Sequence, residues 1–123
     1  TGVLTNGGLD WETFDLSLDV PISITSSGTN VYSVRIHSPD DAAHALMMKL
    51  QGSPDDEYIE LSKPFQGAGW HTITFDFSTI TAQAWPNPGG AWDGNADFSR
   101  LVFFVDGGSK TTGDFHFDDI KKN

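Results

Sequence analysis

Residues 70–78 read Trp-His-Thr-Ile-Thr-Phe-Asp-Phe-Ser, and this stretch decides the fold. Its apolar side chains, Ile73, Phe75 and Phe77, alternate with polar ones. A period of two predicts a β-strand with one face buried and one face in water. Because no segment of the chain has a convincing helical period, the layer that covers the apolar face should be a second sheet. The stretch therefore predicts an all-β fold, a two-sheet antiparallel β-sandwich.

The rest of the chain supplies further strands of the same kind. We predict seven to eight or more strands, including residues 11–18, 31–38, 45–51, 58–61, 100–106 and 114–120, with a short one at Val3 and Leu4. Residues 100–106 are apolar on both sides, which predicts a central strand. Pro21 restricts its neighbourhood to an edge or a bend. Residues 79–98 show little pattern, and loops of this length are often functional.

Length and charge limit the classes of function. The 123 residues fit one domain, which we take to span residues 1–123. Seventeen acidic and seven basic residues give a formal net charge of −10, which argues against binding to nucleic acid or anionic membranes. No apolar run reaches the roughly 18 residues of a membrane span, so we expect no membrane insertion. The absence of cysteine excludes disulfides and thiolate chemistry.

Several of these strands together resemble a known class of domain. The relevant segments are residues 32–39 (Tyr-Ser-Val-Arg-Ile-His-Ser-Pro), 48–50 (Met-Lys-Leu), 70–78, 101–106 (Leu-Val-Phe-Phe-Val-Asp) and 115–120 (Phe-His-Phe-Asp-Asp-Ile). The set resembles bacterial carbohydrate-binding modules of the galactose-binding-like jelly-roll kind, which occur on Bacteroidetes glycan-degrading proteins. The resemblance covers roughly residues 10–120. It implies a jelly roll that is extracellular or at the cell surface and is attached to a larger glycan-degrading protein.

Aromatic side chains are the first candidates for contact with a sugar, because the C–H face of a pyranose stacks on an aromatic ring. Trp85 and Trp92 flank the Pro/Gly-rich loop, and Trp11, which begins a strand, could reach the same ligand. Alternatively, one loop tryptophan folds inward to anchor the loop, and Trp11 packs over the edge of the sandwich. Trp70 follows a Gly-x-Gly turn, where a tryptophan more often caps the core.

Polar partners for the sugar hydroxyls come from the outward positions of the strands. Arg35, His37 and Lys49 point outward by alternation, and we expect their strands to be neighbours. Phe104, and more weakly His116, would extend the same face. The alternative is an ordinary solvated face on which these cations pair with carboxylates.

The carboxylates predict a calcium site only weakly. In modules of the resembled class, a Phe-Asp-Asp-Ile strand often lies beside an N-terminal acidic strand that helps to hold a structural calcium, which makes Asp118 and Asp119 the candidate ligands. The N-terminal segment here has no obvious Phe-Glu motif. We expect no required cofactor beyond this possible calcium.

These observations lead to one functional expectation and one alternative. We expect a non-catalytic module that binds an extracellular polysaccharide, with a β-glucan as the first candidate, and that tethers an attached enzyme to its substrate. An enzyme is not expected, because glycoside hydrolysis needs two carboxyl groups facing each other across a cleft. The alternative is a structural or protein-interaction β-sandwich of a multidomain extracellular protein.

Overall fold

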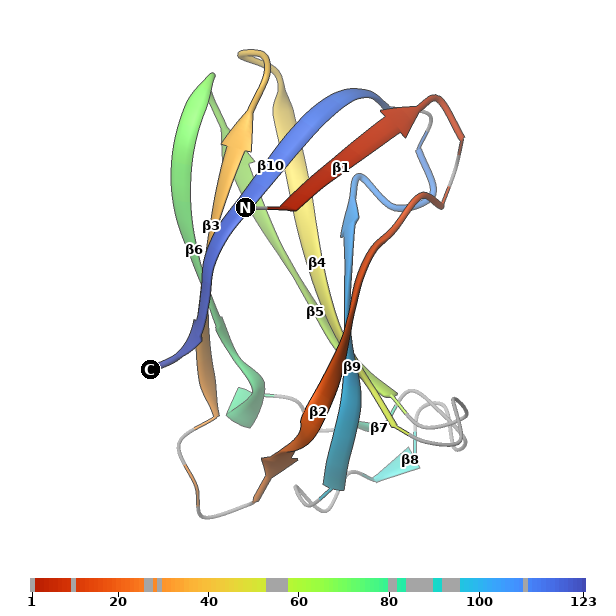
Figure 1. Cartoon of the computed structure of the whole chain (residues 1–123), viewed down its shortest axis with the longest axis vertical. Helices are drawn as coiled ribbons and strands as arrows, with labels where there is room; N and C mark the ends of the chain where they lie inside the picture. The colour runs from red at the N-terminus through yellow and green to blue at the C-terminus, as the bar shows by residue number, and fades with distance from the viewer. Residues whose placement is uncertain are drawn as a thin grey trace.

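The computed structural model describes residues 2–9, 11–25, 28, 30–52, 58–79, 82–83, 90–91, 96–109 and 111–123. Eight strands form two antiparallel sheets of four, as the sequence predicts (Figure 1). Sheet A has the order β1 (Gly2–Gly7), β10 (Thr112–Lys122), β3 (Val31–Ser38), β6 (Gly69–Asp76). Sheet B has the order β2 (Phe14–Ile24), β9 (Ala96–Val105), β4 (Ala43–Gln51), β5 (Tyr58–Gln66).

Two small elements complete the described part of the chain. A 3-10 turn, η1 (Phe77–Thr79), follows β6, and β7 (Ala82–Gln83) pairs with β8 (Gly90–Ala91). No α-helix occurs within the described ranges. Consequently no described helix is long and apolar enough to cross a membrane.

The core lies between the two sheets and is built from the inward positions of the alternating strands. Ile73, Phe75 and Phe77 are buried, as the pattern of residues 70–78 predicts, although the strand ends at Asp76 and Phe77 lies in η1. The largest side chains that are almost wholly removed from solvent are Phe75, Phe77, Phe98, Phe103, Phe115 and Phe117. Burying one such side chain stabilises a fold by about 1.5–3 kcal/mol, and the buried aliphatic side chains around these phenylalanines, such as Ile36, Leu46 and Leu50, add contributions of the same size.

Two strands continue further toward the C-terminus than the sequence pattern indicates. β5 continues to Gln66, past Pro64, and β2 continues past Pro21 to Ile24, with an irregular register between Ser17 and Ile22. Both β5 and β2 are edge strands, where a missing N–H group breaks no ladder bond. β9 is central in its sheet, as predicted, and its outward Val102 is only 4% exposed.

One predicted neighbour relation is wrong. β3 pairs with β10 and β6 in sheet A, whereas β4 pairs with β9 and β5 in sheet B. The link between β3 and β4 thus crosses from one sheet to the other. Arg35 and His37 on β3 therefore do not share a face with Lys49 on β4.

Candidate functional site

The outer face of sheet B carries a hollow of about 330 Å³, which we call the sheet B hollow. It is lined by Trp11, Met47, Lys49, Tyr58, Glu60 and Phe104. The strand register explains why these side chains meet. Lys49 on β4 lies between Val102 of β9 and Glu60 of β5, and Met47 lies beside Phe104. The hollow therefore spans three adjacent strands, with aromatic rings at both of its ends.

Trp11 forms one end of the sheet B hollow. Its side chain is 59% exposed, and its ring meets the ring of Phe104 edge to face, with centroids 5.5 Å apart and planes at 88°. The ring also lies close against Gly107 and Gly108, since a Cβ atom added at Gly107 would come within 2.6 Å of Trp11 Cζ3. Trp11 is thus an exposed aromatic surface that is held in place on two sides.

Tyr58 forms the other end of the hollow. The ammonium nitrogen of Lys49 lies 4.0 Å from the centroid of the Tyr58 ring, which is a close cation–π contact. Glu60 lies directly across the strand pair from Lys49, so a cation and a carboxylate flank the same space. These groups can donate and accept hydrogen bonds beside two aromatic surfaces.

A second charged pair lies near the hollow on the same face. Arg100 donates to a carboxylate oxygen of Asp15 across β2 and β9, at 2.5 Å. Asp15 lies opposite Val102, which in turn lies opposite Lys49. The cation of Arg100 is therefore matched by a carboxylate, and the face carries no marked excess of positive charge.

The structure brings together only some of the predicted site residues. Trp11, Lys49 and Phe104 share the sheet B hollow. Tyr58, Glu60 and Met47 belong to it as well, although the sequence analysis gave them no role. For Tyr58 the available signal was its outward position by alternation with the buried Ile59. Trp85 and Trp92 lie outside the described residues.

Arg35 and His37 lie on the opposite side of the sandwich, on the outer face of sheet A. Trp70 is 45% exposed there, rather than capping the core, and the Arg35 guanidinium lies 4.8 Å from the centroid of its ring. His37 lies between Trp70 and His116 in the strand register. His116 therefore extends the face of Arg35 and His37, while Phe104 extends the face of Lys49.

Asp118 and Asp119, the candidate calcium ligands, have other contacts in the structure. Asp118 accepts a hydrogen bond from the backbone N–H of Asp119 at 3.0 Å, and Asp119 pairs with Arg35 at 3.5 Å. Within the described ranges, no three His, Cys, Asp or Glu side chains cluster closely enough to hold a metal ion. Calcium binding remains a prediction, with no described third ligand beside these two aspartates.

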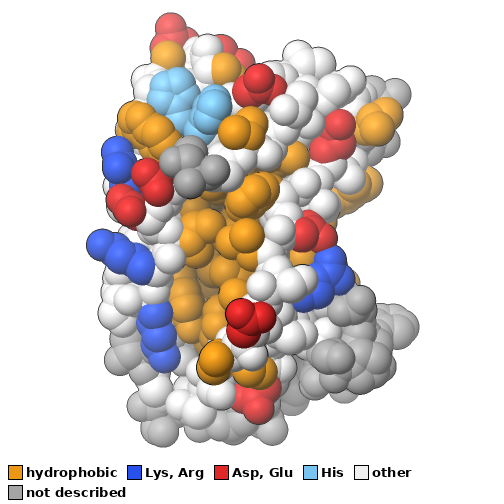
Figure 2. Space-filling view, viewed as in Figure 1, with side chains coloured by type: hydrophobic (Ala, Val, Ile, Leu, Met, Phe, Trp, Pro, Cys, Tyr) orange, Lys and Arg blue, Asp and Glu red, His pale blue; other side chains and the backbone are white. Residues whose placement is uncertain are grey.

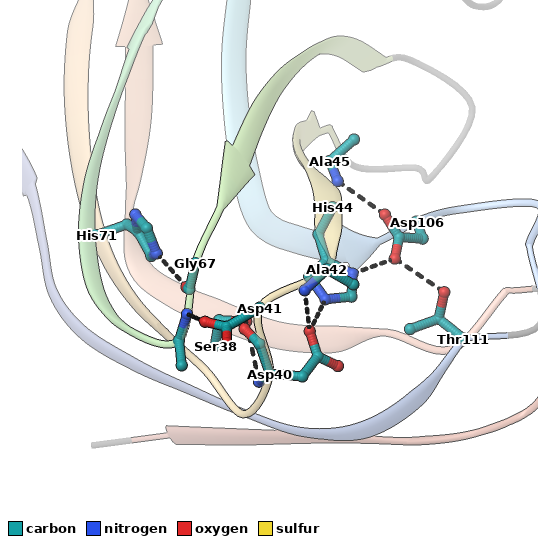
Figure 3. Close-up of polar contacts among 11 residues, drawn as sticks. Ser38, Asp40, Asp41, Ala42, His44, Ala45, Gly67, His71, Asp106 and Thr111 are labelled. Atoms are coloured by element: carbon teal, nitrogen blue, oxygen red, sulfur yellow. Dashed lines mark hydrogen bonds and ion pairs between the residues drawn. The ribbon is translucent and has the colours of Figure 1, made fainter.

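His44 is the most tightly bound polar side chain of the described core. Its Nδ1 lies 2.6 Å from Asp106 and its Nε2 lies 2.7 Å from Asp40 (Figure 3). Burial alone would lower the pKa of His44, but the hydrogen bonds to Asp106 and Asp40 outweigh it and raise the pKa above its usual value of 6.5. The hydrogen bond from His44 and the one from the Ala42 N–H lower the pKa of Asp40. Both ring nitrogens of His44 are hydrogen-bonded, so neither is available to accept a proton from a substrate. We therefore interpret the group of His44, Asp40 and Asp106, which we call the His44 tie, as structural rather than catalytic.

An apolar cleft separates the free edges of the two sheets. Figure 2 shows hydrophobic side chains gathered in a strip down the middle of this view. Two adjoining hollows of about 450 Å³ each occupy the cleft and share Ile120. Leu18, Ile22 and Leu101 line one of them, and Phe14, Leu16 and Phe117 line the other. Polar side chains line the cleft as well, Ser23, Lys121 and Lys122 in one hollow and Asp118 and Asp119 in the other. Its described lining includes no tryptophan, however, whereas the exposed Trp11 lines the sheet B hollow, which makes the sheet B hollow the better fit for a sugar.

Comparisons with known proteins do not assign the chain to a family. Neither the protein-family models nor the curated proteins that were searched gave a match to the sequence.

Proposed function

We propose that this domain is a non-catalytic carbohydrate-binding module and that its ligand lies in the sheet B hollow. The observation that carries the proposal is the exposed ring of Trp11, fixed edge-on against Phe104 in the same hollow as Tyr58, Lys49 and Glu60. Such a ring can stack on the C–H face of a pyranose, while the charged side chains exchange hydrogen bonds with the hydroxyls.

The charges favour a neutral glycan over an acidic one. The chain carries a formal net charge of −10, and on the sheet B face Arg100 is paired with Asp15 and Lys49 lies opposite Glu60. A polysaccharide rich in uronic acid or sulfate would be repelled by the overall field and would find no unmatched pair of cations in this hollow. A β-glucan is therefore the first ligand to test.

The proposed role in the cell follows from binding without catalysis. A module on the outside of a bacterium that holds a polysaccharide raises the local concentration of that polysaccharide for an attached enzyme. We place the domain in an extracellular or cell-surface glycan-degrading protein on this reasoning and on the resemblance of the strand motifs.

The structure supplies a matched pair of variants for the test. Trp11 and Trp70 are both exposed tryptophans, but they lie on opposite faces of the sandwich. Affinity electrophoresis against β-glucans, xylan and alginate should show retardation by a neutral glycan. Trp11→Ala should weaken this binding by about tenfold, the effect of losing a ring contact worth about 1.4 kcal/mol. Trp70→Ala should leave it unchanged.

Two results would count against the proposal. The first is the absence of retardation by every glycan tested, together with unchanged tryptophan fluorescence. The second is equal retention of the wild type and the Trp11→Ala variant. Thermal unfolding of both variants shows whether a loss of binding comes from a loss of fold.

A further inference from the structure

The outer face of sheet A holds two histidines that are direct cross-strand neighbours. The register aligns four side chains in one row across the whole sheet, from Val3 through His116 and His37 to Trp70. The His37 and His116 ring centroids lie 5.9 Å apart, with the ring planes at 84°. The two imidazoles are thus presented side by side on a rigid pair of antiparallel strands.

His37 and His116 differ from the other two histidines in their hydrogen bonding. Of the four histidines, His44 has both ring nitrogens bonded to carboxylates, and His71 Nε2 is bonded to the Gly67 carbonyl oxygen at 2.6 Å. His37 and His116 make no hydrogen bond with any described residue. Moreover, Nδ1 of His37 is shielded from solvent and has no partner within the described part of the chain.

From this arrangement we infer that His37 and His116 form a binding site for a divalent transition-metal ion. A neutral imidazole nitrogen is a preferred ligand for Zn²⁺, Ni²⁺ and Cu²⁺, whereas calcium and magnesium prefer oxygen. Directly opposed residues of an antiparallel pair have Cβ atoms about 4.5–5.5 Å apart. Metal–nitrogen bonds of about 2.0–2.1 Å require the two nitrogens to be roughly 3 Å apart, which rotation of the side chains can provide.

The surroundings fit an open site with two protein ligands. No described group of three metal-binding side chains exists, so water completes the coordination. Asp114 and Asp118 lie two residues from His116 on either side along β10 and add negative charge to the same face. Arg35 lies two residues from His37 along β3, but its guanidinium is turned toward Trp70 and Asp119. The inference does not depend on the proposed glycan site, which lies on the other sheet.

The test is a calorimetric titration of the 123-residue domain with NiCl₂ and with ZnCl₂. His37→Ala and His116→Ala should each weaken binding by about tenfold or more, because a chelating pair becomes a single imidazole. His71→Gln is the matched control, since it removes a histidine of the same sheet that is already hydrogen-bonded, and it should leave the affinity unchanged.

Two further measurements make the outcome decisive. Ni²⁺ should raise the melting temperature of the wild type and of His71→Gln but not of the double variant His37→Ala/His116→Ala. It should also quench tryptophan fluorescence less in Trp70→Phe than in the wild type, because the Trp70 ring lies 5.3 Å from that of His37. Binding that is equally strong in the double variant, or equally weakened by His71→Gln, would overturn the inference.

Discussion

Nδ1 of His44 lies 2.6 Å from Oδ2 of Asp106, and this contact joins strand β4 to the turn after β9, 62 residues away in sequence. Asp106 also accepts hydrogen bonds from the Ala45 N–H at 2.7 Å and from the Thr111 hydroxyl at 2.8 Å. It has a φ of 51°, which is an uncommon conformation for a residue other than glycine. Several hydrogen bonds therefore hold Asp106 in place at the turn beside Gly107 and Gly108, against which Trp11 packs.

The first prediction concerns the pH dependence of this tie. The folded-state pKa of His44 is raised, so its stabilisation is fully present below about pH 6.5 and is lost as pH rises through the raised pKa. The pKa of Asp40 is lowered, so its contribution is present above about pH 4 and is lost as pH falls through the lowered value. The tie should therefore stabilise the fold most between about pH 4 and 6.5.

Urea unfolding of the wild type and His44→Gln measures this effect. At pH 5.5 the variant should be less stable by about 2 kcal/mol, because charge-assisted hydrogen bonds are lost in the core. At a pH well above the raised pKa of His44 the difference should shrink. A difference that stays constant with pH would show that His44 contributes through packing against Phe65 and Phe115 instead of through its charge.

The second prediction concerns Gly107. An alanine Cβ at this position would lie 2.6 Å from Trp11 Cζ3, so the indole must move. Gly107→Ala should therefore weaken glycan binding as Trp11→Ala does, while the melting temperature changes little because the turn is exposed. Ser109→Ala, in the same exposed turn, is the control and should bind normally. Unchanged glycan affinity in Gly107→Ala would mean that the position of the indole is unimportant.

The third prediction concerns Lys49 and Tyr58. Their cation–π contact at a partly exposed site should contribute about 0.5–1 kcal/mol to folding. A double-mutant cycle with Lys49→Met and Tyr58→Leu isolates this coupling. Both single variants should also bind the glycan more weakly, since both residues line the hollow. Coupling that is zero within error would indicate that Lys49 is free to move in solution.

Alternation was sufficient to predict the inner faces of the strands but not the sheet to which each strand belongs. The buried positions of Val34, Ile36, Met48 and Phe117 follow from a period of two, because burial of one face fixes the side chains of a strand. The same period occurs whether two successive strands pair or lie in opposite sheets. For this reason Arg35 and Lys49 were predicted to be neighbours, although they lie on opposite faces of the sandwich.

The site residues that were predicted and those that were missed differ for the same physical reason. Lys49 and Phe104 were identified from residue type and outward position, and Trp11 from residue type and its place at the start of a predicted strand. The structure places all three in one hollow. Tyr58 was missed because its relation to Lys49 depends on the register of β4 with β5, which the sequence does not specify. His44 lies at an inward position of β4, where a pattern analysis expects an apolar residue. Its role depends on two aspartates from different turns, which only the folded chain brings together.

The final prediction concerns the edge of β10 beyond its pairing with β1. That pairing ends at Phe117, and the described residues provide no further partner on this edge. A bulge at Asp119, with φ of 46°, and two exposed lysines, Lys121 and Lys122, follow. Bulges and lysines are the features by which natural edge strands avoid pairing with other chains.

Replacing both lysines by valine should therefore make the protein self-associate through this edge and the apolar cleft beside it. Sedimentation velocity at increasing concentration should show dimers or larger species for Lys121→Val/Lys122→Val. The matched variant Lys121→Ser/Lys122→Ser removes the same charges without adding apolar surface, and it should associate less. If the valine variant stays monomeric at all concentrations, the bulge at Asp119 alone is sufficient to protect the edge, and the lysines have no such role.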